Sequence, residues 1–354
     1  MREEARRAGG WLSFEQFMHL ALYAPGLGYY AHDSAKLGRL PDDGSDFVTA
    51  PELSALFGQT LAVQVAEALV RTGTRELWEF GAGSGALAEQ VLDALHAQGV
   101  EVTAYHIVDV SASLRERQQK RLARFGDRVC WERELPARME GVVLGNEVLD
   151  AMPVRLLART GGVWHERGVV WDEGAASWRW SDRPTDARPP CEVPGSGDYV
   201  TEIHPQAEAF IATLGRHLVR GAAFFIDYGF GEGEYYHPQR HMGTVMCHQA
   251  HRADDDPLVA VGAKDITAHV DFTGIAVAAQ NAGFELLGYT TQAWFLLNGG
   301  MAQRMEAASL PERAMAQKLL MEHEMGELFK VIGLCRGEPW PAVGFARGDR
   351  TRML

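Results

Sequence analysis

Residues 79–85 read Glu-Phe-Gly-Ala-Gly-Ser-Gly, and this stretch decides the fold. A short run that ends in apolar residues, 75–78, precedes it, and apolar residues at helical spacing follow over 86–95. The glycines therefore lie where a strand turns sharply into a helix. Gly81 and Gly83 have no Cβ, so the backbone can turn there and a ligand can approach closely. The helix that follows offers free N–H groups and the positive end of its dipole to an anionic group.

A second apolar run, 102–108, ends in Asp109. A carboxylate at the tip of the next parallel strand can accept hydrogen bonds from both hydroxyls of a ribose. A dinucleotide site has the spacing G-x-G-x-x-G, whereas these glycines follow G-x-G-x-G, with Glu79 two residues before the first. The pattern is similar to the nucleotide loop of class I S-adenosylmethionine methyltransferases. A glycine turn without a ligand is the alternative, and the order strand, loop, helix, strand and acid favours the nucleotide site.

The whole chain has 354 residues and a net charge of 34 − 47 = −13. This length suffices for one large core or for two domains. The negative charge disfavours nucleic acid as a partner and favours a basic peptide or protein. The four cysteines are scattered without a C-x-x-C pair, which favours a reducing compartment. No apolar run approaches about 18 residues, so we expect a soluble, cytoplasmic protein without membrane insertion.

We predict a three-part organisation. Residues 1–72 form an N-terminal helical extension over the cofactor site, 73–153 and 200–354 form a seven-stranded Rossmann-like core, and 154–199 form a β-hairpin insertion. A capping box at Ser13 predicts a helix whose buried stripe begins at Phe14. The polar, glycine-rich stretch up to Ser45 predicts a mobile loop. The tryptophans of 154–199 form either the insertion's own small core or a partner surface, and the first interpretation is favoured.

The buried strand 141–145 leads directly into Asn146, Glu147 and Asp150. In doubly wound sheets, ligands bind outside the carboxyl ends of the strands, so these polar side chains are candidates for the site. Asn146 could alternatively cap the following turn. The helix that we expect from Glu52 to about Val70 begins after Pro51. Its N-terminus either touches a ligand, or Glu52 merely complements the helix dipole at the surface.

The stretch from Gly229 to Lys264 is rich in Gly, His and Asp, and we expect a long loop there. It contains Cys247, His248 and His251 in the pattern Cys-His-x-x-His. This spacing fits no structural zinc pattern well, so metal binding is disfavoured. An imidazole that lines a substrate channel is the favoured interpretation.

Taken together, these motifs resemble the MidA-like family of S-adenosylmethionine (SAM)-dependent methyltransferases. Mitochondrial members of that family are complex I assembly factors that methylate an arginine. The resemblance extends over most of the chain, with Ala82 where the family usually has proline and Asp109 where it often has glutamate. The matching segments are 23–30, 46–52, 81–85, 146–153, 227–229, 265–272 and 291–292.

The resemblance implies an α/β class I methyltransferase fold, SAM as the cofactor, and a protein substrate that could be a respiratory-complex subunit. It implies a guanidinium clamp made by Glu147 and Asp150, with Glu52 as a third candidate. The residues expected to bind the cofactor are Glu79, Gly81, Gly83, Gly85, Asp109, Asn146 and Pro51.

Three other functions stay open at this point. The first is an NAD(P)-dependent oxidoreductase, which the glycine spacing disfavours. The second is a non-catalytic assembly chaperone that keeps the fold and grips a basic partner with the same carboxylates. The third is a methyltransferase that acts on a small molecule.

Overall fold

The computed structural model describes residues 1–31 and 48–354. The loop that we predict up to Ser45, together with the first two residues of the 46–52 motif, lies outside the described residues. No helix in the described part is long and apolar enough to cross a lipid bilayer.

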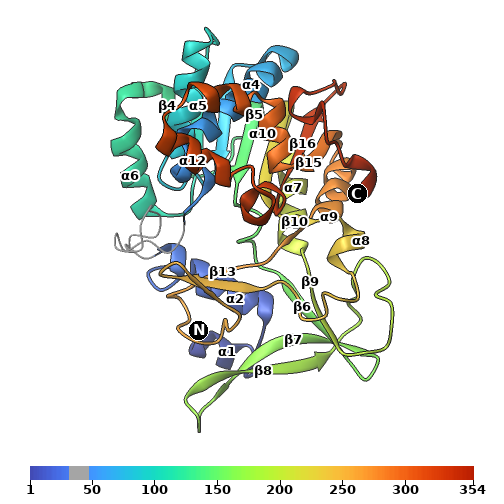
Figure 1. Cartoon of the computed structure of the whole chain (residues 1–354). Helices are drawn as coiled ribbons and strands as arrows, with labels where there is room; N and C mark the ends of the chain where they lie inside the picture. The colour runs from blue at the N-terminus through green and yellow to red at the C-terminus, as the bar shows by residue number, and fades with distance from the viewer. Residues whose placement is uncertain (32–47) are drawn as a thin grey trace.

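The central sheet has the strand order β15-β16-β10-β5-β2-β3-β4 (Figure 1). Neighbouring strands from β10 to β4 are parallel, whereas β16 runs antiparallel to both β10 and β15. A further short strand, β14, pairs with the end of β10. The seven strands along this path confirm the seven-stranded sheet that we predicted, with β14 as an additional short strand. The bounds are β2 (Glu76–Phe80), β3 (Ala104–Val108), β4 (Val129–Glu132), β5 (Met139–Asn146), β10 (Leu218–Phe230), β14 (Val270–Asp271), β15 (Glu285–Thr291) and β16 (Phe329–Arg336).

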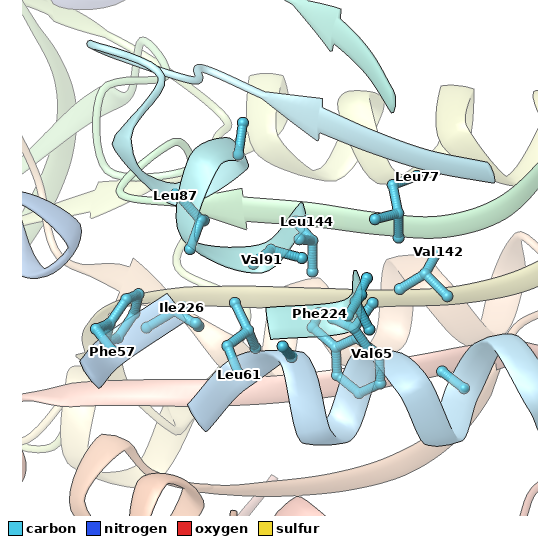
Figure 2. Packing of buried hydrophobic residues seen from close by; sticks show 14 of the residues in the cluster. Phe57, Leu61, Val65, Leu77, Leu87, Val91, Val142, Leu144, Phe224 and Ile226 are labelled. Carbon is cyan, nitrogen blue, oxygen red and sulfur yellow. The ribbon is translucent and has the colours of Figure 1, made fainter. Parts of the chain in front are cut away.

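Helices cover both faces of this sheet. On one face, α4 (Ala55–Thr72) and α5 (Ala86–Ala97) pack against β5 and β10. Figure 2 shows Phe57, Leu61 and Val65 of α4 directed towards Phe224 and Ile226 of β10. On the other face, α7 (Pro205–His217) and α9 (Phe272–Asn281) bury a second apolar cluster. Each fully buried Val, Leu, Ile or Phe side chain in these clusters stabilises the fold by about 1.5–3 kcal/mol.

The helix expected from Glu52 is interrupted at Ser54. A short helix α3 (Ala50–Leu53) ends there, and the extended backbone of Ser54 (φ −153°) begins α4 in a new direction. The Ser54 hydroxyl accepts a hydrogen bond from the N–H of Leu56 at 3.3 Å, so it caps α4. Apolar spacing continues across this break, which is why the sequence predicted a single helix.

The N-terminal 72 residues do not form one unit. The segments α1 (Arg2–Arg7), β1 (Trp11–Ser13) and α2 (Phe14–Tyr23) join the antiparallel sheet in the lower half of Figure 1, whereas α4 belongs to the main core. The capping box at Ser13 is present, and Phe14 is fully buried. The antiparallel sheet consists of β1, β6 (Arg155–Thr160), β7 (Val163–Asp172), β8 (Ser177–Pro184) and β9 (Tyr199–Ile203).

The tryptophans of the antiparallel sheet are divided between core and surface. Trp178 is buried beside α2, and Trp171 packs against the same cluster. Trp180 stays 39 % exposed, although its ring lies 5.5 Å from that of Phe14. Most of this aromatic surface therefore serves the sheet's own packing.

A third, small sheet replaces part of the loop that we expected after Gly229. It has the order β12-β11-β13, with β11 (Met246–Gln249), β12 (Arg252–Asp254) and β13 (Asp265–Thr267). The long loop that we expected up to Lys264 therefore contains two short strands, β11 and β12, and β11 also pairs with β13, which follows the stretch. The remaining elements are η1 (Tyr29–Ala31), α6 (Ala112–Leu122), η3 (Ala123–Arg128), α8 (Glu232–Tyr235), α10 (Gln292–Asn298), α11 (Met301–Ala307), α12 (Leu310–Lys318), η4 (Glu322–Gly326), η5 (Val343–Phe345) and η6 (Thr351–Met353).

Candidate active site

A cavity of about 1060 Å³ lies at the carboxyl ends of the parallel strands. Its wall includes Gly81 and Gly83 after β2, Asp109 after β3, and Glu147 and Asp150 after β5. The carboxyl ends of parallel strands meet at one edge of the sheet, which brings these segments together. The opposite wall comes from α2, η1 and β13.

The glycine loop has the backbone geometry that its sequence requires. Gly81, Gly83 and Gly85 have φ values of 63°, 54° and 83°, in the left-handed region that side chains disfavour. The N–H of Gly81 donates to the carbonyl of Val108 at 3.0 Å, which ties the loop to β3. Gly85 is the N-cap of α5 and lies outside the cavity wall.

Glu79 lies beneath the glycine loop, away from the residues that line the cavity. It is buried, and the Tyr105 hydroxyl donates to its carboxylate at 2.7 Å. Burial raises the pKa of Glu79 to about 8; the hydrogen bond from Tyr105 opposes this shift, and the nearby Asp109 contributes to it. The structure thus places Glu79 where it supports the loop from within the protein.

Asp109 and the residue that follows it face the cavity together. One oxygen of the Asp109 carboxylate accepts a hydrogen bond from the N–H of Ser111 at 2.9 Å. Val110 is 79 % exposed although it is apolar, and it lines the cavity. Sequence reasoning did not select Val110, although its place directly after the acid was a usable signal.

The loop after β5 holds Glu147 in a strained backbone conformation. Its φ of 55° is uncommon for a residue with a side chain. Its N–H donates to the carbonyl of Ile226 at 2.9 Å, and the Asn146 side chain donates to its carboxylate at 2.8 Å. Asn146 therefore orients Glu147, and its own buried Oδ1 has no partner among the described residues.

Asp227, at the end of β10, organises the same loop from behind. Its Oδ2 accepts hydrogen bonds from three consecutive backbone N–H groups, at 3.1, 2.9 and 3.3 Å. These donors belong to Val148, Leu149 and Asp150. Burial raises the pKa of Asp227 well above its ordinary range, with Asp150 and Glu147 as further causes. The sequence contained this residue in a motif, but we had not assigned it a role.

Glu147 and Asp150 are acids that the cavity keeps hard to ionise. Burial, and then the charge of Asp150, raise the pKa of Glu147 to about 8. Burial raises the pKa of Asp150 to about 6, although a hydrogen bond from Tyr228 opposes this shift. The Oδ1 atom of Asp150 has no partner among the described residues. A cation that entered between these carboxylates would favour their charged forms.

A third carboxylate lies on the opposite wall. The Tyr30 hydroxyl contacts both oxygens of Asp265, at 3.0 and 3.1 Å. Its ring stacks on Tyr23, whose hydroxyl donates to the carbonyl of Ala151 at 2.8 Å. These contacts connect the N-terminal segment to the loop that holds Asp150. Asp265 lines the cavity and belongs to a predicted motif, but it was not among the predicted site residues.

The structure does not bring Glu52 and Pro51 into the wall of this cavity. The carboxylate of Glu52 accepts a hydrogen bond from Ser84 and pairs with Arg121 at 2.7 Å. The carbonyl of Pro51 accepts from the Gln90 side chain at 2.7 Å. Both residues therefore connect α3 to the glycine loop and to the helix that follows it, and a role of Glu52 in the guanidinium clamp stays a prediction. Arg121 was not predicted as a partner of Glu52, because a run of basic residues on a helix more often forms a solvent-exposed face.

Three histidines line the cavity, His19, His248 and His269. Burial lowers the pKa of His269 to about 4, so this imidazole is neutral near pH 7. Within the described residues, no group of three His, Cys, Asp or Glu side chains could hold a metal ion. His248 thus lies where we expected an imidazole to line a channel.

Residues 60–290 match the profile of a family described as S-adenosyl-L-methionine-dependent methyltransferase. The chain belongs to this family. A methyltransferase named protein arginine methyltransferase NDUFAF7 homolog, mitochondrial, from Drosophila melanogaster is 29 % identical to it, with 95 % of this chain and 86 % of the relative aligned. Protein arginine methyltransferase NDUFAF7, mitochondrial, from Mus musculus is 28 % identical, with 90 % and 78 % aligned.

A solved structure from Burkholderia thailandensis resembles this methyltransferase over its whole length. It is 51 % identical in sequence and has a TM-score of 0.96. The alignment covers 100 % of this chain and 95 % of the chain in that structure. That crystal structure contains S-adenosylhomocysteine. This structure and the family profile confirm the predicted class I methyltransferase fold. They also confirm the predicted cofactor.

The cofactor of this methyltransferase is S-adenosylmethionine, and the residues of the cavity fit it. The glycine loop leaves room for close approach, Asp109 offers a carboxylate to a ribose, and Val110 offers an exposed apolar side chain to a flat base. The unpartnered Oδ1 of Asn146 provides a buried acceptor at the same edge of the sheet. The cofactor is therefore SAM, and not the NAD(P) of the alternative oxidoreductase function.

Proposed function

We propose that this methyltransferase transfers a methyl group from SAM to a guanidinium nitrogen of an arginine in a partner protein. The observation that carries the proposal is the set of three carboxylates, Glu147, Asp150 and Asp265, in the same cavity as the glycine loop. The names of the fly and mouse relatives support the arginine acceptor. The net charge of −13 suits a basic partner segment.

A guanidinium needs carboxylates for two reasons. It is a delocalised cation with five N–H donors and no acceptor, so paired carboxylates can orient it in one plane. It is also a poor nucleophile, because its nitrogen lone pairs are delocalised. SAM, when bound, supplies an activated methyl group, and most of the protein's contribution is positioning.

Glu147 and Asp150 are placed to do both tasks. They would bind the guanidinium, turn one nitrogen towards the methyl group, and accept the proton that this nitrogen loses when the new C–N bond forms. A carboxylate with a pKa raised to about 6 or 8 is a better proton acceptor than an ordinary one. Three tyrosines, Tyr23, Tyr30 and Tyr228, line the same cavity.

Glu147→Gln tests this assignment most directly. We expect methyl transfer from radiolabelled SAM to an arginine-containing basic peptide to fall at least about 100-fold, while affinity for S-adenosylhomocysteine stays within a few fold. Glu166→Gln is the matched control, since Glu166 pairs with Arg155 at 2.9 Å in the antiparallel sheet, outside the cavity wall. Loss of transfer and cofactor binding together in Glu147→Gln would contradict the assigned role.

The identity of the acceptor needs a separate assay. Labelled methyl groups should appear on arginine after acid hydrolysis of a protein mixture treated with the enzyme. Label on a small molecule alone would favour the small-molecule alternative. Cofactor binding and partner capture without any transfer, together with normal cellular function of Glu147→Gln, would favour the assembly chaperone.

We further propose a respiratory-complex subunit as the substrate and the cytoplasm as the location. The support for the subunit is the family resemblance, and the support for a reducing compartment is the four free cysteines. Transfer to purified respiratory-complex subunits, compared with an equal mass of other basic proteins, tests the substrate. Cell fractionation tests the location.

A further inference from the structure

Gln118 is a completely buried side chain on a largely polar and charged helix. It lies in α6, whose sequence over 112–122 contains three arginines, a lysine and a glutamate. A buried amide without hydrogen-bond partners destabilises the folded state, so its presence at this position calls for hydrogen bonds. Its hydrogen bonds to other described residues go to Gly83 and Asp109 of the cofactor site and to Trp131 of β4.

The Gln118 side chain joins two segments that are separate in sequence. Its Nε2 donates to the carbonyl of Gly83 at 2.9 Å and to Oδ2 of Asp109 at 2.8 Å. Its Oε1 accepts a hydrogen bond from the indole N–H of Trp131 at 3.0 Å. One amide therefore connects the glycine loop after β2 with the acid after β3.

Chemistry fixes the orientation of this amide. The indole of Trp131 can only donate, so the atom that faces it must be the amide oxygen. The carbonyl of Gly83 and the ionised carboxylate of Asp109 can only accept, so both must face the NH₂ group. A flipped amide would leave three buried mismatches, and the side chain is therefore held in one state.

The same helix also touches the glycine loop through Leu122 and Arg121. A Cβ on Gly85 would lie 3.3 Å from Leu122 Cδ1 and 3.5 Å from the Cα of Gln118. Arg121 contacts the Ser84 hydroxyl directly. The loop is thus packed against the face of α6 on which Gln118 lies.

We infer that Gln118, held by Trp131, is the positioning residue that sets the distance and orientation between the glycine loop and Asp109 for the bound cofactor. Asp109 then has one oxygen oriented by the N–H of Ser111 and the other by the amide of Gln118. The hydrogen bond from Gln118 to the carbonyl of Gly83 also orients the peptide group of Gly83. The inference concerns cofactor binding alone and does not depend on the identity of the methyl acceptor.

Calorimetric titration with S-adenosylhomocysteine tests the inference. We expect Gln118→Leu to weaken binding about 10- to 100-fold, because it removes a charge-assisted hydrogen bond to Asp109 and the link to Gly83. Gln118→Glu keeps the shape but cannot donate to both acceptors in either protonation state, so it should weaken binding at least about fivefold. Trp131→Phe should weaken it about two- to fivefold, because the amide loses the donor that orients it.

Gln64 offers a matched control. It is buried in α4, donates to Glu67 at 2.9 Å and accepts from the N–H of Gly344 at 2.7 Å, away from the cavity. Gln64→Leu should lower the melting temperature and leave affinity for S-adenosylhomocysteine within about twofold. This separates loss of stability from loss of cofactor positioning.

A double-mutant cycle distinguishes a positioning role of Gln118 from a general contribution to stability. If Gln118 acts through Asp109, Gln118→Leu combined with Asp109→Asn should weaken binding at least about threefold less than the product of the two single losses. Binding losses that multiply fully would overturn the inference. Binding within twofold of wild type in both Gln118→Leu and Gln118→Glu would overturn it as well, and if the leucine variant fails to fold, Gln118→Glu and Trp131→Phe carry the test.

Discussion

The Asp227 carboxylate accepts a hydrogen bond from the backbone N–H of Leu149 at 2.9 Å, across 78 residues of sequence. The same oxygen also receives the N–H groups of Val148 and Asp150. One carboxylate at the end of β10 thus shapes the loop that presents Glu147 and Asp150. The site depends on this acid even though it is not among the residues that line the cavity.

Asp227→Ala should therefore impair both stability and methyl transfer. The three N–H groups would lose their buried acceptor, so we expect the free energy of unfolding to fall by about 1–3 kcal/mol. We also expect kcat to fall at least about 10-fold, because Glu147 and Asp150 lose their support. Urea unfolding and a transfer assay measure the two effects. Asp227→Asn keeps one acceptor oxygen and should be milder, and equal kcat in Asp227→Ala and wild type would contradict the role.

Gly81→Ala should weaken cofactor binding, whereas Gly73→Ala should not. Both glycines have nearly the same left-handed conformation, with φ of 63° and 64°. A Cβ on Gly73 would meet nothing within 4 Å, whereas one on Gly81 would lie 3.0 Å from Val148 Cγ2 in the cavity wall. Each variant should lose about 1–2 kcal/mol of stability from backbone strain. Calorimetry with S-adenosylhomocysteine should separate them, and equal affinities would show that the loop tolerates the side chain.

Stability should fall as the pH rises from about 5 to 8. The folded protein raises the pKa of Glu147 from 4.5 to about 8 and that of Asp150 from 3.8 to about 6. Between the ordinary and the raised values, the folded state binds more protons than the unfolded state, so increasing pH destabilises it. We expect the melting temperature to fall over this range.

Glu147→Gln isolates the contribution of one carboxyl group to this pH dependence of stability. Glutamine cannot ionise, so this variant should be more stable than wild type at pH 8 by at least about 1 kcal/mol and equal to it near pH 4. Other buried acids such as Glu79 titrate in both proteins and cancel in the comparison. Parallel melting curves for the two proteins at all pH values would rule out a raised pKa for Glu147.

Tyr30→Phe should reduce acceptor binding more than cofactor binding. Its hydroxyl contacts both oxygens of Asp265, and phenylalanine would leave that carboxylate less well oriented. We expect KM for an arginine peptide to rise about 3- to 10-fold with little change in affinity for S-adenosylhomocysteine. Tyr289→Phe, in a buried tyrosine outside the cavity wall, is the control. An unchanged KM in Tyr30→Phe would remove Asp265 from the acceptor site.

Several parts of this site were predictable because their chemistry is local. Glycines at positions 81, 83 and 85 require a turn between strand and helix, and Asp109 follows a recognisable apolar run. The structure places Gly81, Gly83, Asp109, Asn146, Glu147 and Asp150 around one cavity. Their separate roles stay predictions until the variants are measured.

Other residues could not be found in this way, because their partners lie far away in sequence. Glu52 is 69 residues from Arg121, and Tyr30 is 235 residues from Asp265. Gln118 looked like one more polar residue on a solvated helix, although it is completely buried. Periodicity reports which side of an element is apolar, but it does not report which polar side chain will meet another.

The sequence by itself determined the sheet, the glycine loop and the amphipathic elements around them. These follow from local rules of backbone conformation and from the spacing of apolar residues. Only the tertiary structure decided that Glu52 braces the glycine loop, that Asp227 shapes the loop of Glu147 and Asp150, and that Asp265 faces them. Hydrogen bonds and raised pKa values depend on distance and burial in three dimensions, and both arise only when the strands, helices and loops pack together.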